Sequence, residues 1–419
     1  MKQQGILAIA AAALLSLTLT APMEGRQRGQ QVQLPEGAGR EMVQATCTKC
    51  HGLNLITNSA GFTRAEWTRL FGSMIALPKN EADTIATYLA KAFDQKPDAP
   101  KAVIIPGPVS VNIKVWGAPT LGSRPHDPLA ARDGSIWWTG QYANRLGRLD
   151  PRTGAMKEYP LDTPKSGPHG LVEDRDGNIW YTGVSVREVG RLNPKTGTVT
   201  EYQMPLPEAR GPHTPIFDQK GMFFFTLQSG HVGRINPATG EVKLAKTPTD
   251  NTYPYGIQVN SQGVPWYVDF RGNRVGSVDP VTMEIKEYTL PNPDARPRRL
   301  AITPDDVIWY TDFPRGYLGR FDPKTGQVRE WLSPGGRDSE PYGIAAVGDV
   351  VWYSESGVKP NTLVRFDTRT ETFQTWAIPA GGHVIRNMMA TPQGNLVLAN
   401  SGINQVALVE VGRGGNSSQ

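Results

Sequence analysis

Residues 167–202, GPHGLVEDRDGNIWYTGVSVREVGRLNPKTGTVTEY, decide the fold of this chain. The stretch holds about four short runs rich in Val, Ile, Tyr and Trp, separated by turn sequences such as Asp-Gly and Pro-Lys-Thr-Gly. Its pattern recurs every 42 to 44 residues, in copies that begin near Arg124, Gly167, Gly211, Tyr253, Arg296, Glu340 and His383. Four strands per copy at this period are typical of a β-propeller blade, so the seven copies predict a seven-bladed propeller over residues 111–411.

The two ends of the repeat region indicate how the propeller closes. The last copy stops at Val411 without a fourth strand, whereas residues 111–119 precede the first copy and resemble a fourth strand. We therefore expect residues 111–119 to complete the last blade, which would remove the exposed sheet edges of an open ring. Residues 412–419 are expected to form a disordered tail.

The first 36 residues have the features of an export segment. Met1 and Lys2 are followed by an apolar stretch from Ile6 to Leu19, which predicts a signal peptide over residues 1–21 and a periplasmic or secreted protein. An uncleaved membrane anchor stays open as the alternative. Residues 22–36 are polar and lack periodicity, and residues 97–110 are rich in proline, so both are predicted linkers.

Cys47 and Cys50 are the only cysteines in the chain, and His51 follows directly. Two thiols at this spacing can add to the two vinyl groups of one porphyrin, and the adjacent imidazole can then bind the iron. A disulfide or half of a zinc site is the alternative, but zinc would need two further ligands and no second cysteine pair exists. The motif therefore predicts covalently bound haem c.

A sixth iron ligand is expected further along the chain, and Met74 is the candidate. A core methionine is the alternative, because that is the commoner use of the residue. After Asn80, the spacing of Ile85, Tyr88, Leu89 and Phe93 places them on one face of a helix. The order of haem motif, methionine and helix resembles small class I cytochromes c over residues 37–96. We expect a mostly β protein in which a small all-α cytochrome c domain precedes the propeller.

Two repeat positions are expected to face the propeller mouth, because an antiparallel hairpin brings the start of its first strand beside the end of its second. The first position is occupied by His126, His169, His213, Tyr255, Arg298, Tyr342 and Arg386. The second is occupied by Gly140, Gly183, Leu227, Asp269, Asp312, Glu355 and Asn400. The three histidines could bind a divalent metal or supply a general base. Alternatively the positions are only polar channel lining, with Arg298 and Asp312 as a buried ion pair.

The blade pattern, with Pro-His/Tyr-Gly followed by Gly-x-Ile-Trp-Tyr-Thr and x-x-Gly-Arg-Leu, resembles the streptogramin B lyase (virginiamycin B lyase) family. The resemblance implies a lyase that opens a cyclic depsipeptide by elimination, with Mg²⁺ polarising the ester and a histidine removing the proton. The matching positions carry both metal-type carboxylates, Glu340 and Glu355. However, Arg298 and Tyr342 replace the two family histidines. Neither is an ordinary proton acceptor at neutral pH, so the resemblance supports the fold more than the activity.

Three functions are compatible with these features. The first is electron transfer by the haem, with a redox partner protein or a small-molecule substrate at the propeller mouth. The second is a metal-assisted C–O lyase or lactone hydrolase, with candidate residues Glu340, Glu355, Tyr342, Arg298, Asp269 and Asp312. The third is a non-catalytic binding module. The net charge of +5 is mild and no basic run interleaved with aromatics occurs, so no nucleic-acid partner is expected, and we expect a monomer.

Overall fold

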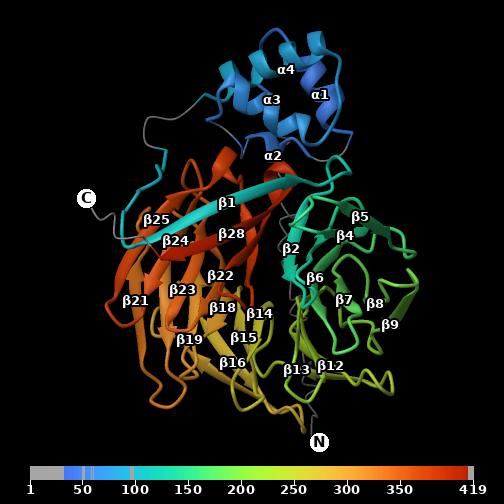
Figure 1. Cartoon of the computed structure of the whole chain (residues 1–419), viewed down its shortest axis with the longest axis vertical. Helices are drawn as coiled ribbons and strands as arrows, with labels where there is room; N and C mark the ends of the chain where they lie inside the picture. The colour runs from blue at the N-terminus through green and yellow to red at the C-terminus, as the bar shows by residue number, and fades with distance from the viewer. Residues whose placement is uncertain (1–32, 50–51, 58, 60, 95–98, 414–419) are drawn as a thin grey trace, which may run out of the picture.

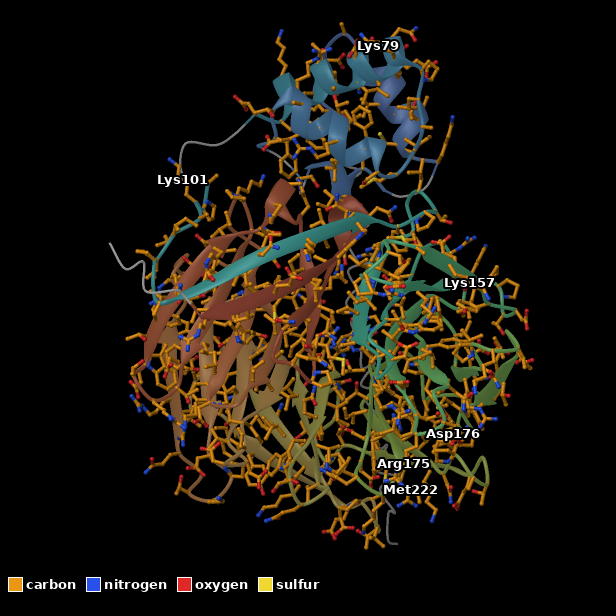
Figure 2. All side chains as sticks on the ribbon, viewed as in Figure 1. Lys79, Lys101, Lys157, Arg175, Asp176 and Met222 are labelled. Atoms are coloured by element: carbon orange, nitrogen blue, oxygen red, sulfur yellow. The ribbon has the colours of Figure 1, made fainter. Side chains whose placement is uncertain are left out.

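The computed structural model describes residues 33–49, 52–57, 59, 61–94 and 99–413. Seven four-stranded antiparallel sheets form a propeller, and a small helical unit lies at one end of the molecule, next to β1 and β28 (Figure 1). The prediction of a mostly β, seven-bladed propeller is confirmed. Charged side chains such as Lys79, Lys157, Arg175 and Asp176 stand on the outer surface (Figure 2).

Each blade begins with its innermost strand. Blades one to three comprise β2 (Pro125–Ala130), β3 (Ile136–Gly140), β4 (Arg145–Leu149) and β5 (Met156–Pro160); β6 (Pro168–Glu173), β7 (Ile179–Gly183), β8 (Glu188–Leu192) and β9 (Val199–Gln203); and β10 (Pro212–Phe217), β11 (Phe223–Leu227), β12 (His231–Ile235) and β13 (Val242–Lys246). Blades four to six comprise β14 (Pro254–Val259), β15 (Pro265–Asp269), β16 (Arg274–Val278) and β17 (Ile285–Thr289); β18 (Pro297–Ile302), β19 (Ile308–Asp312), β20 (Tyr317–Phe321) and β21 (Val328–Leu332); and β22 (Pro341–Val347), β23 (Val350–Glu355), β24 (Thr362–Asp367) and β25 (Thr372–Ala377).

Blade seven joins the two ends of the repeat region. It comprises β26 (Ile385–Ala390), β27 (Leu396–Asn400), β28 (Gln405–Arg413) and β1 (Val109–Gly117). The pairing of β1 with β28 runs without a break from Val109 opposite Arg413 to Gly117 opposite Gln405. This nine-residue ladder ties the first strand of the propeller to its last strand, so unfolding either end requires opening blade seven.

The repeated Trp of the second strand forms the core of the blades. Trp138, Trp180, Trp266, Trp309 and Trp352 are all at most 5% exposed. The glycine of the Gly-Arg-Leu segment provides room for the aromatic ring opposite, since a Cβ at Gly147 would lie 2.0 Å from the ring of Trp138. Burial of one such side chain stabilises the fold by about 1.5–3 kcal/mol. These residues are blade core and contribute no ligand site.

Hydroxyl groups on the second strands connect neighbouring first strands. Thr182 accepts a hydrogen bond from the backbone N–H of Gly170 in its own blade and donates one to the carbonyl of His213 in the next. Thr139, Thr226, Thr311 and Ser354 make the equivalent donations to the blades that follow them. Because these bonds are buried and run from blade to blade, they fix the first strands that line the channel.

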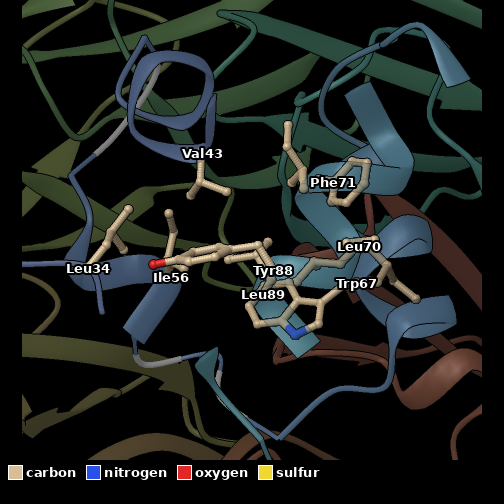
Figure 3. Close-up of a cluster of buried hydrophobic side chains, with 11 residues drawn as sticks. Leu34, Val43, Ile56, Trp67, Leu70, Phe71, Tyr88 and Leu89 are labelled. Atoms are coloured by element: carbon tan, nitrogen blue, oxygen red, sulfur yellow. The ribbon is translucent and has the colours of Figure 1, made fainter. Parts of the chain in front are cut away.

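The helical unit contains α1 (Arg40–Cys47), α2 (Asn54–Thr57), α3 (Arg64–Gly72) and α4 (Lys79–Ala92). Its core includes Val43, Trp67, Leu70 and Leu89 (Figure 3). In α4, the predicted face of Ile85, Tyr88 and Leu89 is buried, as the spacing of these residues indicates, while Phe93 follows the helix as its C-cap. No helix in the described part of the chain is long and apolar enough to span a membrane.

The helical unit packs against the propeller side on which the first strands begin. Ile403, in the loop after β27, is part of the apolar cluster of the helical unit. The ring of Phe62 lies 4.4 Å from that of His383 and 4.2 Å from the Nζ of Lys359. Gly122, just before β2, donates its backbone N–H to the carbonyl of Ser73 at 3.0 Å. The unit therefore touches loops of blades six, seven and one at the mouth face.

Candidate functional site

The first strands bring a row of aromatic side chains together in the channel. The rings of His126 and His169 are 3.8 Å apart between centroids, those of His169 and His213 are 3.7 Å apart, and that of Tyr255 lies 3.9 Å beyond. The hydroxyl of Tyr255 then lies 2.6 Å from that of Tyr342. Five residues from five blades thus form one continuous series, as their shared repeat position predicts.

The three stacked histidines are neutral. Burial lowers the pKa of each well below the usual value, and neighbouring positive groups, including Arg299, add to this effect. The Nδ1 of His169 and the Nε2 of His213 are buried without a hydrogen-bond partner. A histidine that resists protonation to this extent is a weak general base at neutral pH. The three histidines are therefore better suited to line the mouth as uncharged groups than to act as bases. We call them the neutral histidine floor of the mouth.

A buried ion pair that the sequence analysis missed crosses the channel. Arg299 donates to both oxygens of Asp127, at 2.8 and 3.2 Å, and both side chains are 3% exposed. The same carboxylate contacts the Nδ1 of His126 at 2.8 Å and accepts from the Nδ2 of Asn387 at 2.9 Å. Asp127 therefore has hydrogen-bond partners on both oxygens.

The repeat itself contained a signal for this pair. The residue after each first mouth position alternates between a polar side chain and glycine around the ring: Asp127, Gly170, Thr214, Gly256, Arg299, Gly343 and Asn387. A Cβ at Gly170 would lie 2.2 Å from the Cδ of Pro215, so the neighbouring first strand requires glycine there. The polar residues of the alternate blades meet across the axis instead.

This network argues against a metal in the channel. Among the described residues, one group of three ligand side chains lies within 4.8 Å of one another: His126, Asp127 and His169. Arg299 already supplies the positive charge that a cation would bring to Asp127. A metal would have to displace this guanidinium from a buried site, at the cost of leaving it unpaired.

The three carboxylates at the second mouth position are fully buried and bind their own loops. Glu355 accepts hydrogen bonds from Ser333, Thr362 and the backbone N–H of Gly335. Asp269 accepts from the backbone N–H groups of Tyr253 and Arg271 and contacts Arg274; Asp312 accepts from the N–H of Arg296 and from Arg315 at 2.7 Å. The alternative of an Arg298–Asp312 ion pair is therefore wrong, because Arg315 is the partner of Asp312.

These contacts bear directly on the magnesium site that the family resemblance implies. Both oxygens of Glu355 already accept hydrogen bonds from protein donors, so neither is open to Mg²⁺ without loss of those bonds. Glu340 stands at the exposed rim. Partial burial of its carboxyl raises its pKa, and the nearby charge of Arg298 opposes this rise without cancelling it. The residues present do not fit a magnesium centre.

Arg298 takes the place of one family histidine and lies in a box of aromatic rings. Its guanidinium carbon is 3.7 Å from the ring centre of Tyr342, 4.1 Å from that of Phe313 and 4.6 Å from that of Phe270. Such cation–π contacts hold the guanidinium in place without neutralising its charge. The mouth beside Tyr342 is consequently positive.

Tyr342 takes the place of the other family histidine, and its environment activates it. Burial raises the pKa of its phenol, but Arg298, Arg386 and Arg299 together with the hydrogen bond from Tyr255 outweigh burial and lower it to about 8. The partner Tyr255 changes in the opposite direction, since burial and the proximity of Tyr342 raise its pKa to about 12. The two phenols thus divide into a proton acceptor and a proton donor.

Two of the predicted haem residues, Cys47 and Met74, lie in the helical unit. Cys47 is the last residue of α1 and packs against the helical core, whereas Cys50 and His51 lie outside the described residues. Met74 follows α3 and is 39% exposed, so the alternative of a core methionine is wrong. The Nε1 of Trp67 is buried without a hydrogen-bond partner, which leaves a donor available to a carboxylate such as a haem propionate.

Comparisons with known proteins agree with the propeller geometry. A solved structure of streptogramin B lyase is 23% identical, with a TM-score of 0.65, over 72% of this chain and 98% of the other. Selenomethionine-substituted virginiamycin B lyase from Staphylococcus aureus is 22% identical, with a TM-score of 0.65, over 72% and 99%. Hydrazine synthase of Kuenenia stuttgartiensis is 14% identical, with a TM-score of 0.57, over 70% and 96%. At these identities the likenesses show the fold alone.

A search of curated proteins finds no match to the chain. The model of the virginiamycin B lyase family matches residues 108–358, from the closing strand β1 into blade six. This match covers more than half of the chain and includes Arg298, Glu340, Tyr342 and Glu355. The chain therefore belongs to the virginiamycin B lyase family.

Proposed function

We propose that this chain is an exported c-type haem protein that exchanges electrons with a small molecule or a redox partner protein bound at the propeller mouth. The sequence Cys47-Thr-Lys-Cys50-His51 supports the haem, and the small helical core around Trp67 and Leu70 supports a compact domain to hold it. The propeller would bind and orient the molecule that is oxidised or reduced.

One contact carries this proposal. The backbone N–H of Gly122 donates to the carbonyl of Ser73, the residue before the candidate ligand Met74. Arg124, which lies at the mouth, follows Gly122 by two residues. Two residues of extended chain span at most about 7 Å, so Gly122 lies close to the mouth. The predicted iron ligand and the mouth thus meet on one side of the molecule, which suits electron exchange between them.

The residues present fit a haem. Cys47 and Cys50 would hold it through two thioether bonds, His51 and Met74 would bind the iron, and the N–H of Trp67 would donate to a propionate. The bound haem would supply one-electron exchange. The chain's own contribution is to fix Met74 against the loop of Gly122 and to exclude water with the apolar helical core.

Replacing Met74 with leucine is expected to remove the sixth iron ligand while leaving haem covalently attached. The oxidised wild-type protein should show a methionine-to-iron charge-transfer band, which the M74L variant should lose, and the reduction potential of M74L should fall because a thioether ligand favours ferrous iron. Optical spectra and a potentiometric titration of the full chain check this result.

Met42 provides the matched control, because it packs partly buried against the same helical core and is not a proposed ligand. M42L should keep both the band and the potential. A band that persists in M74L would assign the sixth ligand to another residue.

A second candidate function is proton abstraction by Tyr342, favoured by its hydrogen bond with Tyr255 and by Arg298 over its ring. In an elimination, the phenolate would accept the proton next to a carbonyl, the C–O bond of the ester on the adjacent carbon would break, and its carboxylate would leave as the double bond forms. Arg298 would stabilise the negative charge that develops on the carbonyl oxygen. This candidate uses the mouth alone and requires no haem.

Tyr342 is expected to ionise near pH 8, ahead of the other tyrosines, and any ring opening of a streptogramin should rise with the same midpoint. Near-ultraviolet absorbance of tyrosinate and a pH–rate profile check this. Because the pKa of the folded state lies below the unfolded value of about 10, the tyrosinate adds stability above pH 10 that is lost as pH falls through 8.

Tyr342→Phe should abolish the early ionisation, and Tyr255→Phe should raise its midpoint because the phenolate loses a hydrogen-bond donor. An early ionisation that survives Y342F belongs to another group. If Y342F keeps full ring-opening activity, Tyr342 is not the proton acceptor.

A further inference from the structure

Three arginines at the mouth have no carboxylate partner. Within the described residues, no ion pair involves Arg124, Arg298 or Arg386, although each lies partly buried around Tyr342. The Nε atoms of Arg298 and Arg386 are buried without a hydrogen-bond partner, and the one side-chain bond of Arg298 is a 3.5 Å contact to the hydroxyl of Tyr255. Guanidinium groups in this setting retain unused donors.

The neighbouring Arg299 differs in having a carboxylate partner in the same channel, although its Nε is also buried without a hydrogen-bond partner. Its guanidinium donates two hydrogen bonds to Asp127, whose negative charge balances it, and a third to the hydroxyl of Thr214. No comparable acid serves the three mouth arginines, since Asp269, Asp312 and Glu355 are bound to their own loops. Glu340 is the remaining carboxylate at the rim, and it interacts with Arg298 alone among the three.

The three arginines also act on one another and on the same phenol. Burial and the charge of Arg386 together lower the pKa of Arg124 to about 10. Arg386 and Arg298 both lower the pKa of Tyr342. The neutral histidine floor does nothing to relieve this excess of positive charge. The charge of Arg386 thus disfavours the charge of Arg124, and a bound anion would offset this effect, whereas Tyr342, Tyr255 and Glu340 outweigh burial and raise the pKa of Arg298.

We propose that the propeller mouth binds a small organic carboxylate, held by Arg298 and Arg386 with Arg124 at the edge, close to the buried ring of Tyr342. This inference rests on the proposed function only in taking the mouth as the place where the reacting molecule binds. Arginine is suited to the task because its planar fork can donate two parallel hydrogen bonds to one carboxylate. The aromatic box around Arg298 provides apolar surface for the carbon skeleton.

The test is calorimetric titration of the haem-loaded full chain with succinate, with its neutral isostere succinamide and with inorganic sulfate. Succinate should bind saturably at one site per chain, and succinamide should bind at least about tenfold more weakly because it lacks the charge. Equal affinity for succinate and succinamide would overturn the proposal, as would binding of sulfate without binding of succinate. Haem content and spectrum are read on the same sample, so failure of the haem proposal is seen separately.

Two variants localise the site. Arg386→Gln and Arg298→Gln should each weaken succinate binding about tenfold or more, because each removes a charged donor. Among the described residues, the side chain of Arg386 makes no hydrogen bond, so R386Q tests the site even if R298Q is poorly folded. Arg152→Gln, at an exposed turn between β4 and β5, is the matched loss of one charge and should bind as wild type.

A second readout reports the charge of a bound anion close to Tyr342. Saturating succinate should raise the midpoint of the early tyrosine ionisation, because the bound anion offsets the arginines that lower the pKa of Tyr342. The shift should vanish in Tyr342→Phe. Succinate binding that is unchanged in both R298Q and R386Q and leaves this midpoint unmoved would place the anion elsewhere and refute the inference.

Discussion

Replacing Arg299 with methionine is expected to destabilise the propeller by about 3–5 kcal/mol, because Asp127 is left charged and unpaired in the centre of the molecule. The carboxylate would keep only His126 and Asn387 as partners, and neither carries a positive charge there. Urea unfolding followed by tryptophan fluorescence measures the loss, since the blade tryptophans are buried throughout the ring.

Two further variants separate the ion pair from general damage. The double variant Arg299→Met with Asp127→Leu should recover much of the stability, because both charges leave together. Arg329→Met is the matched control at the exposed pair with Glu371 and should cost less than about 1 kcal/mol. A single variant R299M as stable as R329M would show that the channel ion pair contributes little.

The same ion pair helps to keep the mouth positively charged. Because Asp127 is neutralised by Arg299, it does not offset the charges of Arg298 and Arg386 nearby. The blades that the virginiamycin B lyase resemblance highlights thus carry a positive, aromatic mouth with a phenol of low pKa. The histidine blades form its neutral floor. This division follows from which polar side chains find partners inside the propeller.

The propeller could be predicted from the sequence because its determinants are local. The period of the turns, the Trp of each second strand and the Gly opposite it act within one blade, and their spacing predicts the blade wherever it occurs. The antiparallel hairpin also allowed the residues at the rim to be named. Pro168 pairs with Gly183, which places His169 at the mouth as its repeat position implies.

The use of those rim residues could not be predicted, because it depends on partners from distant loops. The sequence position of Glu355 predicts a metal ligand, whereas in the structure both its oxygens accept hydrogen bonds, one from Ser333 and the other from Thr362. Asp127 and Arg299 are separated by 172 residues, and no local pattern pairs them. Even so, the residue after the first mouth position alternates between glycine and a polar residue from blade to blade. This alternation indicates which blades have side chains that can meet across the channel.

The sequence likewise does not predict how the helical unit packs against the propeller. Phe62, Ile403 and His383 are single residues in loops, and their contact depends on how the segment before the propeller folds back. Residues within the predicted linker do not form a loose spacer either. Ile105 exchanges hydrogen bonds with Thr375 of β25, so this segment lies along blade six. The linker thus helps to place the helices over the mouth face.

The central claim, a covalent haem beside the propeller mouth, predicts an all-or-none effect of the two cysteines. Each thiol would form one thioether bond, so the double variant Cys47→Ala with Cys50→Ala should lose covalent haem completely. Both cysteines precede the first propeller strand in the sequence, so the unfolding transition of the propeller should be unchanged.

The most direct measurement is the mass of the denatured full chain after expression in a host that matures c-type haem, together with its spectrum before and after reduction with dithionite. The account predicts one haem per wild-type chain that survives denaturation and reduces reversibly, and none on the double cysteine variant. A wild-type chain that folds, with its propeller intact, but carries no covalent haem would contradict the account and leave the mouth around Tyr342 as the functional site.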